Sequence, residues 1–255
     1  MPVTVVAPQQ VGTYSLEIDL VHEDVRWLEA GVTVPLEIVP AGSLRHNVPG
    51  RLRRLRGQRI PKILHRVWVG PAPMPEEHVE FGESWRAHHP DWDHRLWTED
   101  DLAELGIERA YVERAKSPSE ISNLMRYRIL ERHGGVYVDT DFECLRPLGS
   151  ILRGVEAFAA YTLPGIAATG IIGCISGHPA LRQAAEQSLI TVGTAPAPTP
   201  TGPQFFTQVL ADHPEVTVFP RELFFPYLWD EPHRRYERFE HAYAVHHWAL
   251  SWRVT

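Results

Sequence analysis

The stretch Ser117–Asp141, SPSEISNLMRYRILERHGGVYVDTD, predicts a capped helix, a glycine turn and a buried strand in direct succession. Ser117 and Glu120 have the spacing of a capping box, and Pro118 stands at the first helical position, where its missing N–H costs no hydrogen bond. The pair Gly134–Gly135 supplies the positive φ that ends a helix. Apolar residues that recur at helical spacing would face a core: Ile121, Leu124, Met125 and Ile129.

Two carboxylates follow the short apolar strand predicted over residues 136–138. In an extended backbone Asp139 and Asp141 point to the same side, and Thr140 points away. Two neighbouring carboxylates repel each other, so that one of them takes up a proton. A divalent cation such as Mg²⁺ or Mn²⁺, which prefers oxygen ligands, would remove that repulsion. The pair is therefore a candidate metal site.

Polar side chains of the predicted helix would reach the same region. Ser122 and Arg126 share one face of the helix at i, i+4, and Asn123 lies beside them. A hydroxyl, an amide and a guanidinium near a cation suit a phosphate-bearing, hydroxyl-rich ligand. An isolated DxD is more often a strand end that runs into a solvated turn, so the surrounding residues decide between the two interpretations.

Those surroundings resemble a known family. The pattern S-N-L-M-R-Y, then L, then G-G-V-Y-V-D-T-D resembles the sugar-binding DxD region of the family 32 glycosyltransferases, the group of the fungal initiating α-1,6-mannosyltransferases. It is also similar, at the same serine-to-aspartate spacing, to the catalytic domain of the large clostridial glucosylating toxins. The resemblance covers roughly residues 60–252 and implies an α/β, GT-A-like fold, a mixed sheet flanked by helices. Asn123 departs from the pattern, because the family usually has Asp at this contact to the donor sugar.

The resemblance implies a nucleotide-sugar donor, a UDP- or GDP-sugar, and Mn²⁺ or Mg²⁺ as cofactor. Asp141 would bind the cation directly, and Asp139 would bind the ribose or the cation through water. His246 lies in a segment similar to the family's H-x-W…S-W element, which continues to Ser251–Trp252, and would be a further metal ligand. The expected catalytic residues are Asp139, Asp141 and Arg126, and the expected donor-binding residues are Trp68, Ser122, Asn123, Arg126, Tyr137 and Asp139.

Trp68 is placed by a second matching segment. Ile60–Gly70, IPKILHRVWVG, is an apolar run rich in β-branched residues and predicts a buried strand. Ligands of doubly wound sheets bind at the carboxyl ends of the strands, where Trp68 stands. The segment resembles the family's opening strand, I-P-K-I-I-H-x-x-W, and in the related toxins this tryptophan stacks on the donor's nucleobase. A lone tryptophan at the end of a strand is more often part of the hydrophobic core. His65 in the same segment is expected to have a structural role.

Two domains are expected, residues 1–59 and 60–255. Alternating polar and apolar residues over 14–20 and 32–39 predict two half-exposed strands in a small β-rich extension. A run of arginines then forms a basic link, interpreted as a solvated linker rather than a patch for an acidic partner or a membrane surface: Arg51, Arg53, Arg54, Arg56 and Arg59.

Composition narrows the possible partners and location. A formal net charge of -7 argues against nucleic acid as a partner. No run approaches the roughly 18 apolar residues of a membrane span, and the N-terminus lacks a signal pattern. Cys144 and Cys174 are the only cysteines, too few for a disulfide framework. We therefore expect buried thiols in a reducing compartment and a cytoplasmic location.

Two other functions fit parts of the pattern. A phosphotransferase of the haloacid dehalogenase type also places D-x-D after an apolar strand, but it needs a downstream lysine and none follows Lys116. Glu143 also stands where that class has Thr or Val. A non-catalytic sugar-nucleotide-binding module is the other alternative, which Asn123 keeps open. Family 32 enzymes retain the anomeric configuration, and no carboxylate is placed as a nucleophile, so front-side attack and double displacement both stay open. The acceptor is unknown.

Overall fold

A computed structural model describes residues 12–18, 21–22, 26–27, 32–38, 57–194 and 201–249. The chain divides into two compact units, Met1–Leu52 and Arg53–Thr255. Predictions for Ser251–Trp252 and for four arginines of the basic link lie outside the described residues. The arginines are Arg51, Arg53, Arg54 and Arg56. None of the described helices is both long enough and apolar enough to span a membrane.

The described residues of the N-terminal unit form two antiparallel strand pairs, and the alternation of residues predicts strands over part of them. Strands β1 (Gly12–Ile18) and β4 (Val32–Ile38) pair antiparallel, with Gly12 opposite Ile38 and Ile18 opposite Val32. Two shorter strands, β2 (Val21–His22) and β3 (Arg26–Trp27), also pair antiparallel.

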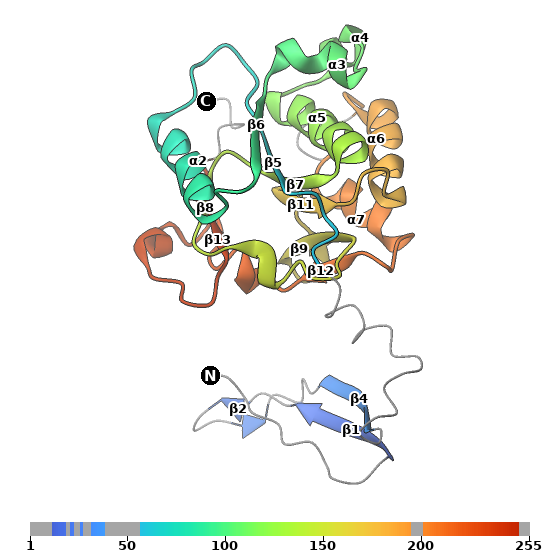
Figure 1. Ribbon diagram of the computed structural model, residues 1–255, viewed down its shortest axis with the longest axis vertical. Coiled ribbons are helices and arrows are strands. Elements are labelled where there is room, and N and C mark those ends of the chain that lie inside the picture. The colour runs from blue at the N-terminus through green and yellow to red at the C-terminus, as the bar shows by residue number, and fades with distance from the viewer. Residues whose placement is uncertain are drawn as a thin grey trace. The chain divides into compact units, whose positions relative to one another are not determined.

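The second unit is built on one mixed sheet flanked by helices, which confirms the predicted fold class (Figure 1). Within the described residues the sheet has seven strands, in the order β10-β9-β11-β7-β5-β6, with β12 paired to β9. The pairs β5·β6, β5·β7 and β9·β12 are parallel, whereas β11 runs antiparallel to both β7 and β9. The strands are β5 (Ile63–Val67), β6 (Asp93–Trp97), β7 (Gly135–Val138), β9 (Ala157–Leu163), β10 (Ile166–Ala167), β11 (Ile171–Cys174) and β12 (Thr217–Phe219).

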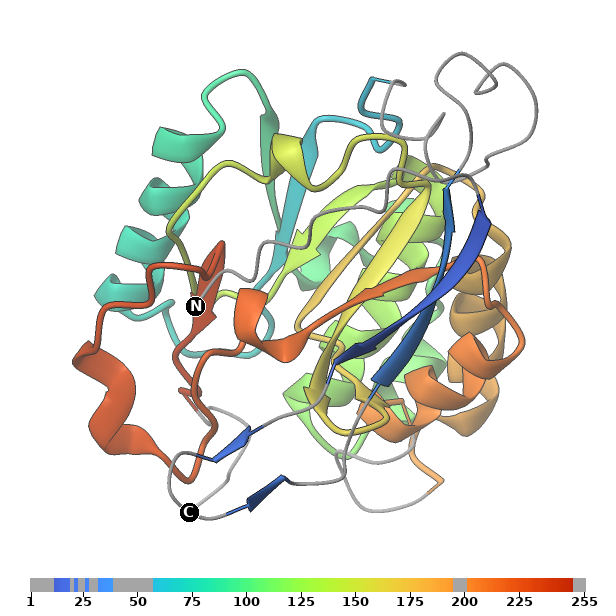
Figure 2. The ribbon, with the colours of Figure 1, turned by 90° about the horizontal axis from the view of Figure 1, so that it is seen from below.

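The helices form layers on both faces of this sheet, and a small two-stranded sheet lies beside it (Figure 2). The helices α5, α6 and α7 lie together on one face, and α2 lies on the other (Figure 1). The α-helices are α2 (Glu76–His88), α3 (Leu102–Leu105), α4 (Arg109–Arg114), α5 (Pro118–His133), α6 (Pro179–Thr191) and α7 (Pro203–Ala211). The 3-10 helices are η2 (Glu99–Asp101), η3 (Leu148–Ser150), η4 (Arg221–Leu223) and η5 (Pro232–Tyr236), and the small sheet pairs β8 (Phe142–Cys144) with β13 (Ala244–His246).

Helix α5 begins and ends where the sequence predicts. Ser117 Oγ accepts a hydrogen bond from the Glu120 backbone N–H at 3.4 Å. The reciprocal bond of a capping box is displaced by one residue, because Glu120 Oε2 accepts from the backbone N–H of Lys116 at 2.9 Å instead of Ser117. The same oxygen accepts a hydrogen bond from the Gly193 backbone N–H at 3.2 Å. This buried carboxylate therefore links the segment after α6 to the start of α5.

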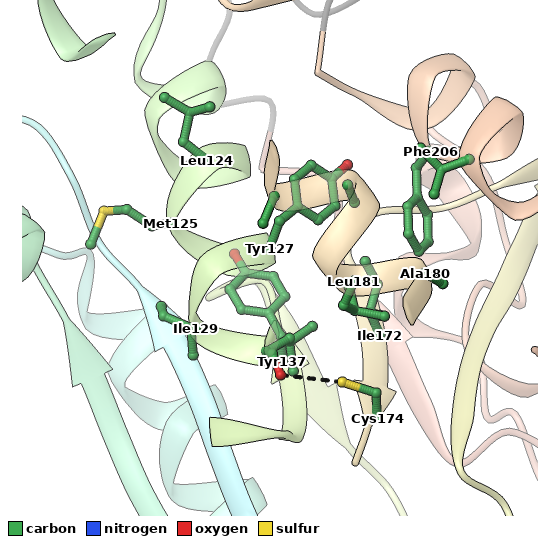
Figure 3. Packing of buried hydrophobic residues seen from close by; sticks show 14 of the residues in the cluster. Leu124, Met125, Tyr127, Ile129, Tyr137, Ile172, Cys174, Ala180, Leu181 and Phe206 are labelled. Carbon is green, nitrogen blue, oxygen red and sulfur yellow. Dashed lines mark hydrogen bonds between the residues drawn. The ribbon is translucent and has the colours of Figure 1, made fainter. Parts of the chain in front are cut away.

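The strand after the helix alternates between two cores, because both faces of the sheet are covered. Val136 and Val138 belong to the cluster on the α2 side, which includes Trp85. Tyr137 belongs to the cluster on the other side, where α5, α6 and β11 meet (Figure 3). Helix α5 contributes four labelled residues to this second cluster: Leu124, Met125, Tyr127 and Ile129.

Both cysteines are buried free thiols, as expected. Burial raises the pKa of Cys144 to about 12. The Cys174 thiol donates a hydrogen bond to Leu130 O at 3.4 Å (Figure 3), and burial raises its pKa as well. Neither thiol is therefore a reactive thiolate at neutral pH.

Candidate metal and donor site

The D-T-D sequence forms a turn and not a continuous extended strand. Strand β7 ends at Val138, and the Phe142 backbone N–H donates to Asp139 O at 3.2 Å before the chain returns as β8. The expectation of extended backbone through Asp141 is therefore wrong. The two carboxylates converge nevertheless, since Asp139 and Asp141 belong to a group of three candidate ligand residues whose ligand atoms all lie within 4.8 Å of one another.

Helix α5 positions Arg126 against Asp139. The guanidinium Nη2 lies 3.0 Å from Asp139 Oδ1 and donates to Ser122 Oγ, also at 3.0 Å. Nη1 donates to Thr169 O at 2.5 Å, and the Tyr137 ring lies under the guanidinium at 4.4 Å. The Tyr137 hydroxyl in turn donates to Asp139 Oδ1 at 2.8 Å. The structure thus brings three residues named from the sequence, Ser122, Tyr137 and Asp139, around the buried guanidinium of Arg126.

Asn123 lies apart from this group. Its amide nitrogen donates a hydrogen bond to Thr201 Oγ1 at 3.1 Å. Tyr127, one helical turn later in α5, donates a hydrogen bond from its hydroxyl to Thr201 O at 2.8 Å. Thr201 is fully buried and stands just before α7. Asn123 therefore fastens the segment before α7 to α5. Within the described residues its amide hydrogen-bonds Thr201 and neither of the two carboxylates.

The third member of the cluster comes from the other end of the domain. Strand β13 pairs antiparallel with β8, and this register places His246 opposite Phe142. His246 Nε2 lies 3.0 Å from Asp141 Oδ1 and 3.8 Å from Asp139 Oδ2. The Ala249 backbone N–H donates to Asp141 Oδ2 at 2.9 Å. The C-terminal segment thus completes the site and also holds one of its carboxylates.

His247 directly follows β13 and contacts the same turn through its backbone, whereas its ring contacts other residues. Its Nε2 lies 2.9 Å from Glu143 Oε2. Its ring stacks on the Phe81 ring, with centroids 4.5 Å apart and an interplanar angle of 8°. Its backbone N–H donates to Asp141 O at 2.9 Å. Sequence reasoning left His247 without a role, because an alternating pair of histidines does not show which ring faces the carboxylates.

Each carboxylate has a positive partner of its own. Burial acts to raise the pKa of Asp139, but Arg126 and His246 together outweigh it and hold the pKa below its usual value. Burial acts to raise the pKa of Asp141 as well, but His246, the Ala249 N–H and His78 together lower it. Burial acts to lower the pKa of His246, and Asp141 and Asp139 together raise it to about 9. The expectation that one of the two carboxylates takes up a proton when no metal is bound is therefore wrong.

The residues fit a divalent cation. Two carboxylates and an imidazole nitrogen form an oxygen and nitrogen donor set of the kind that binds such ions. A Cβ at Gly170 would lie 2.8 Å from Asp139 Oδ2, so only a glycine leaves space beside that oxygen. His246 Nδ1 is buried and has no hydrogen-bond partner among the described residues. A cation here would replace the proton of His246 as the positive partner of Asp141.

One residue, His78, lies between Trp68 and the D-T-D turn and contacts both. The Trp68 ring packs edge-on against His78 at 5.7 Å, and its Nε1–H donates to Ala72 O at 2.8 Å. His78 Nδ1 in turn lies 3.0 Å from Thr140 Oγ1. Arg66 donates to the backbone carbonyl of His78 and, at 3.5 Å, to that of Thr140. Sequence reasoning missed His78 and Arg66, since neither carries a motif and both contacts are distant in sequence.

Comparison with known proteins agrees with the sequence of this site. Residues 75–158 match the family model for a glycosyltransferase sugar-binding region containing a DXD motif. Mannosyl phosphorylinositol ceramide synthase CSH1 of Saccharomyces cerevisiae is 33% identical over 128 residues, which are 48% of this chain and 33% of that protein. Inositol phosphoceramide mannosyltransferase 3 of Schizosaccharomyces pombe is 33% identical over 130 residues, 49% of this chain and 36% of that protein. The matched region thus spans about a third of each relative.

Two solved structures also resemble the chain. PaToxG glycosyltransferase has a TM-score of 0.49 at 14% identity, covering 65% of this chain and 75% of that one. The ligand-free glycosyltransferase domain of the YGT toxin has a TM-score of 0.47 at 10% identity, covering 63% of this chain and 80% of that one. The resemblance to the DxD region of family 32 glycosyltransferases is confirmed by the family model and by the mannosyltransferase relatives.

Proposed function

We propose that residues 60–255 form a metal-dependent, retaining glycosyltransferase that moves a hexose from a nucleotide-sugar donor, a UDP- or GDP-sugar, to an acceptor. The observation that carries the proposal is the convergence of Asp139, Asp141 and His246 beside the buried Arg126, within a chain whose residues 75–158 match a sugar-binding DXD region. Retention is the stereochemistry that the family resemblance implies.

In this proposal Asp139, Asp141 and His246 hold Mn²⁺ or Mg²⁺. A bound cation of this kind offsets the negative charge that develops on a nucleoside diphosphate leaving group. Arg126 is held in place by Ser122, Thr169 and Tyr137, so its charge meets a bound sugar or phosphate without a further loss of side-chain freedom. The preorganised guanidinium and the carboxylates thus orient the donor at the carboxyl end of β7.

The relatives suggest a donor sugar and an acceptor class. Two of them are named for mannose transfer to inositol phosphoceramide. We infer that mannose is the first sugar to test and that the acceptor carries a polyhydroxylated ring.

A direct test is incubation of the full chain with Mn²⁺ and a panel of UDP- and GDP-sugars, with and without EDTA, and measurement of nucleotide release. The proposal expects release from at least one donor, and EDTA should abolish it. Full activity in EDTA would contradict metal dependence. Binding of a sugar nucleotide, seen as a rise in melting temperature, without turnover of any donor or acceptor would instead identify a non-catalytic sugar-nucleotide-binding module.

Replacement of Trp68 by alanine is expected to weaken nucleotide binding by about 1–3 kcal/mol, the range for stacking of a base on an aromatic ring. Trp68 is half-buried, and its ring lies beside His78 and therefore close to the D-T-D turn. Calorimetric titration of UDP and GDP in the presence of Mn²⁺ measures the effect. Trp68→Phe is the matched control, because it keeps an aromatic face. Unchanged affinity in folded Trp68→Ala would show that Trp68 is only core.

Replacement of Asn123 by aspartate is expected to shift the preference between donor sugars by about 10-fold or more, since hydrogen bonds to charged groups contribute roughly 1.5–3 kcal/mol. The bond to Thr201 can persist, because the Thr201 hydroxyl can donate to a carboxylate as readily as it accepts from the amide. Comparison of kcat/KM across the donor panel measures the shift. Identical profiles would mean that the position does not read the donor, and activity gained from none would indicate a lost catalytic function.

A further inference from the structure

Two tryptophans extend toward solvent from the candidate metal site, the group of Asp139, Asp141 and His246. The Trp248 ring lies edge-on to His246, with ring centroids 4.2 Å apart and planes at 88°. The ring centroids of Trp229 and Trp248 are 5.4 Å apart, and the two ring planes meet at 75°. Adding these two separations, 4.2 and 5.4 Å, the ring of Trp229 is at most 9.6 Å from the ring of His246. The pair therefore forms a continuous aromatic path that starts at a candidate metal ligand.

Trp248 is held in a conformation that non-glycine residues rarely adopt. Its φ is 52°, the only positive φ of a non-glycine residue within the described ranges. Its Nε1–H donates to Tyr227 O at 3.0 Å, and the Phe225 ring lies 5.7 Å away. Strained backbone persists where the surroundings fix it, and it concentrates at functional sites. The packing thus keeps the Trp248 ring against His246.

Trp229 differs from most tryptophans of the domain in being open to solvent. Its side chain is 40% exposed, whereas Trp85, Trp92 and Trp97 are buried. Its indole N–H makes no hydrogen bond to any other described residue. The residue therefore presents both an apolar face and a free donor next to the cluster. Those two properties together suit a ring that has an apolar C–H face and hydroxyl groups at its edge.

We propose that Trp229, backed by Trp248, is the platform on which the acceptor of the transfer rests, and that this acceptor is a polyhydroxylated six-membered ring, a pyranose or a cyclitol. The proposal rests on the proposed function, since only a transferase needs an acceptor at this place. Trp68 contacts the D-T-D turn through His78, whereas Trp229 contacts His246 through Trp248. The two aromatic residues thus reach the cluster through different elements, which gives donor and acceptor separate positions.

The acceptor role is tested with methyl α-mannopyranoside and myo-inositol as probes, each at millimolar concentration, with Mn²⁺ and the donor that the panel identifies. Wild type, Trp229→Ala and Trp229→Phe are compared for hydrolysis of the donor by water and for transfer to the probe. In Trp229→Ala the KM for the probe should rise at least five-fold and the ratio of hydrolysis to transfer should rise with it. Trp229→Phe should recover most of the loss, and Tyr236→Ala, an exposed aromatic at 89%, is the matched control.

A second measurement separates this proposal from the proposed function. Saturation-transfer NMR reports binding of the two probes without any turnover. At least one probe should show transfer from wild type, and Trp229→Ala should lose it. No binding of either probe to wild type, an unchanged KM in Trp229→Ala, or a weakened affinity for the nucleotide instead of the probe would each overturn the platform. Probe binding without hydrolysis of any donor would leave the platform supported and contradict the proposed transferase.

Discussion

Replacement of Asp141 by asparagine is expected to lower donor turnover at least about 100-fold, the scale on which loss of one electrostatic contact to a transition state acts. Asparagine has nearly the same shape and can still accept the Ala249 N–H that Asp141 Oδ2 accepts now. It removes the charge that faces His246 at 3.0 Å and that a cation would bind. The loss should therefore fall on catalysis and metal affinity.

Nucleotide release with saturating donor and titrated Mn²⁺ measures this effect, and thermal unfolding reports whether the variant is folded. Asp212→Asn is the matched control, because Asp212 bonds Gln183 near the surface, away from the cluster. Turnover of folded Asp141→Asn within a few-fold of wild type would show that this carboxylate does not serve the reaction.

Replacement of Gly134 by alanine is expected to destabilise the domain by about 2–6 kcal/mol, the sum of backbone strain and overpacking. Gly134 has φ 64° and ψ −152°, a region that is almost restricted to glycine. A Cβ there would also lie 2.5 Å from the backbone nitrogen of Ser176. This contact cannot relax cheaply, because its partner is a main-chain atom just after β11.

Urea unfolding followed by circular dichroism measures the free energy of unfolding. Gly149→Ala is the matched control, since a Cβ at Gly149 meets nothing within 4 Å and its φ is not positive. That variant should change the free energy of unfolding by no more than about 0.5 kcal/mol. A Gly134→Ala variant as stable as Gly149→Ala would mean that the turn relaxes and that the fixed entry into β7 is not required.

The local parts of the site could be predicted because their signals are local. Ser117, Pro118 and Gly134 are adjacent to the ends of α5 and determine them by capping and by positive φ. The i, i+4 spacing of Ser122 and Arg126 fixes their shared face, and the hydrogen bond between them follows. Such relations depend only on helix geometry, so the sequence contains them.

The remaining contacts depend on partners that are far apart in sequence. The turn at Thr140 was missed because alternation was assumed to continue, and its stabilising contact, His78, lies 62 residues earlier. Asn123 bonds Thr201, 78 residues later, which no spacing rule indicates. His246 was named only because the family shows a histidine there, and its distance to Asp141 is set by the register of β13 against β8. Tertiary pairing of this kind is not encoded in any local pattern.

The pairing of β13 with β8 also orders events during synthesis of the protein. Asp139 and Asp141 leave the ribosome long before His246 and Ala249, which come more than a hundred residues later. A nascent chain that has completed α5 and β7 has the two carboxylates but neither the imidazole nor the amide that secures Asp141. Under the proposed function, a partly translated chain therefore lacks one of the three candidate ligands until β13 has paired with β8.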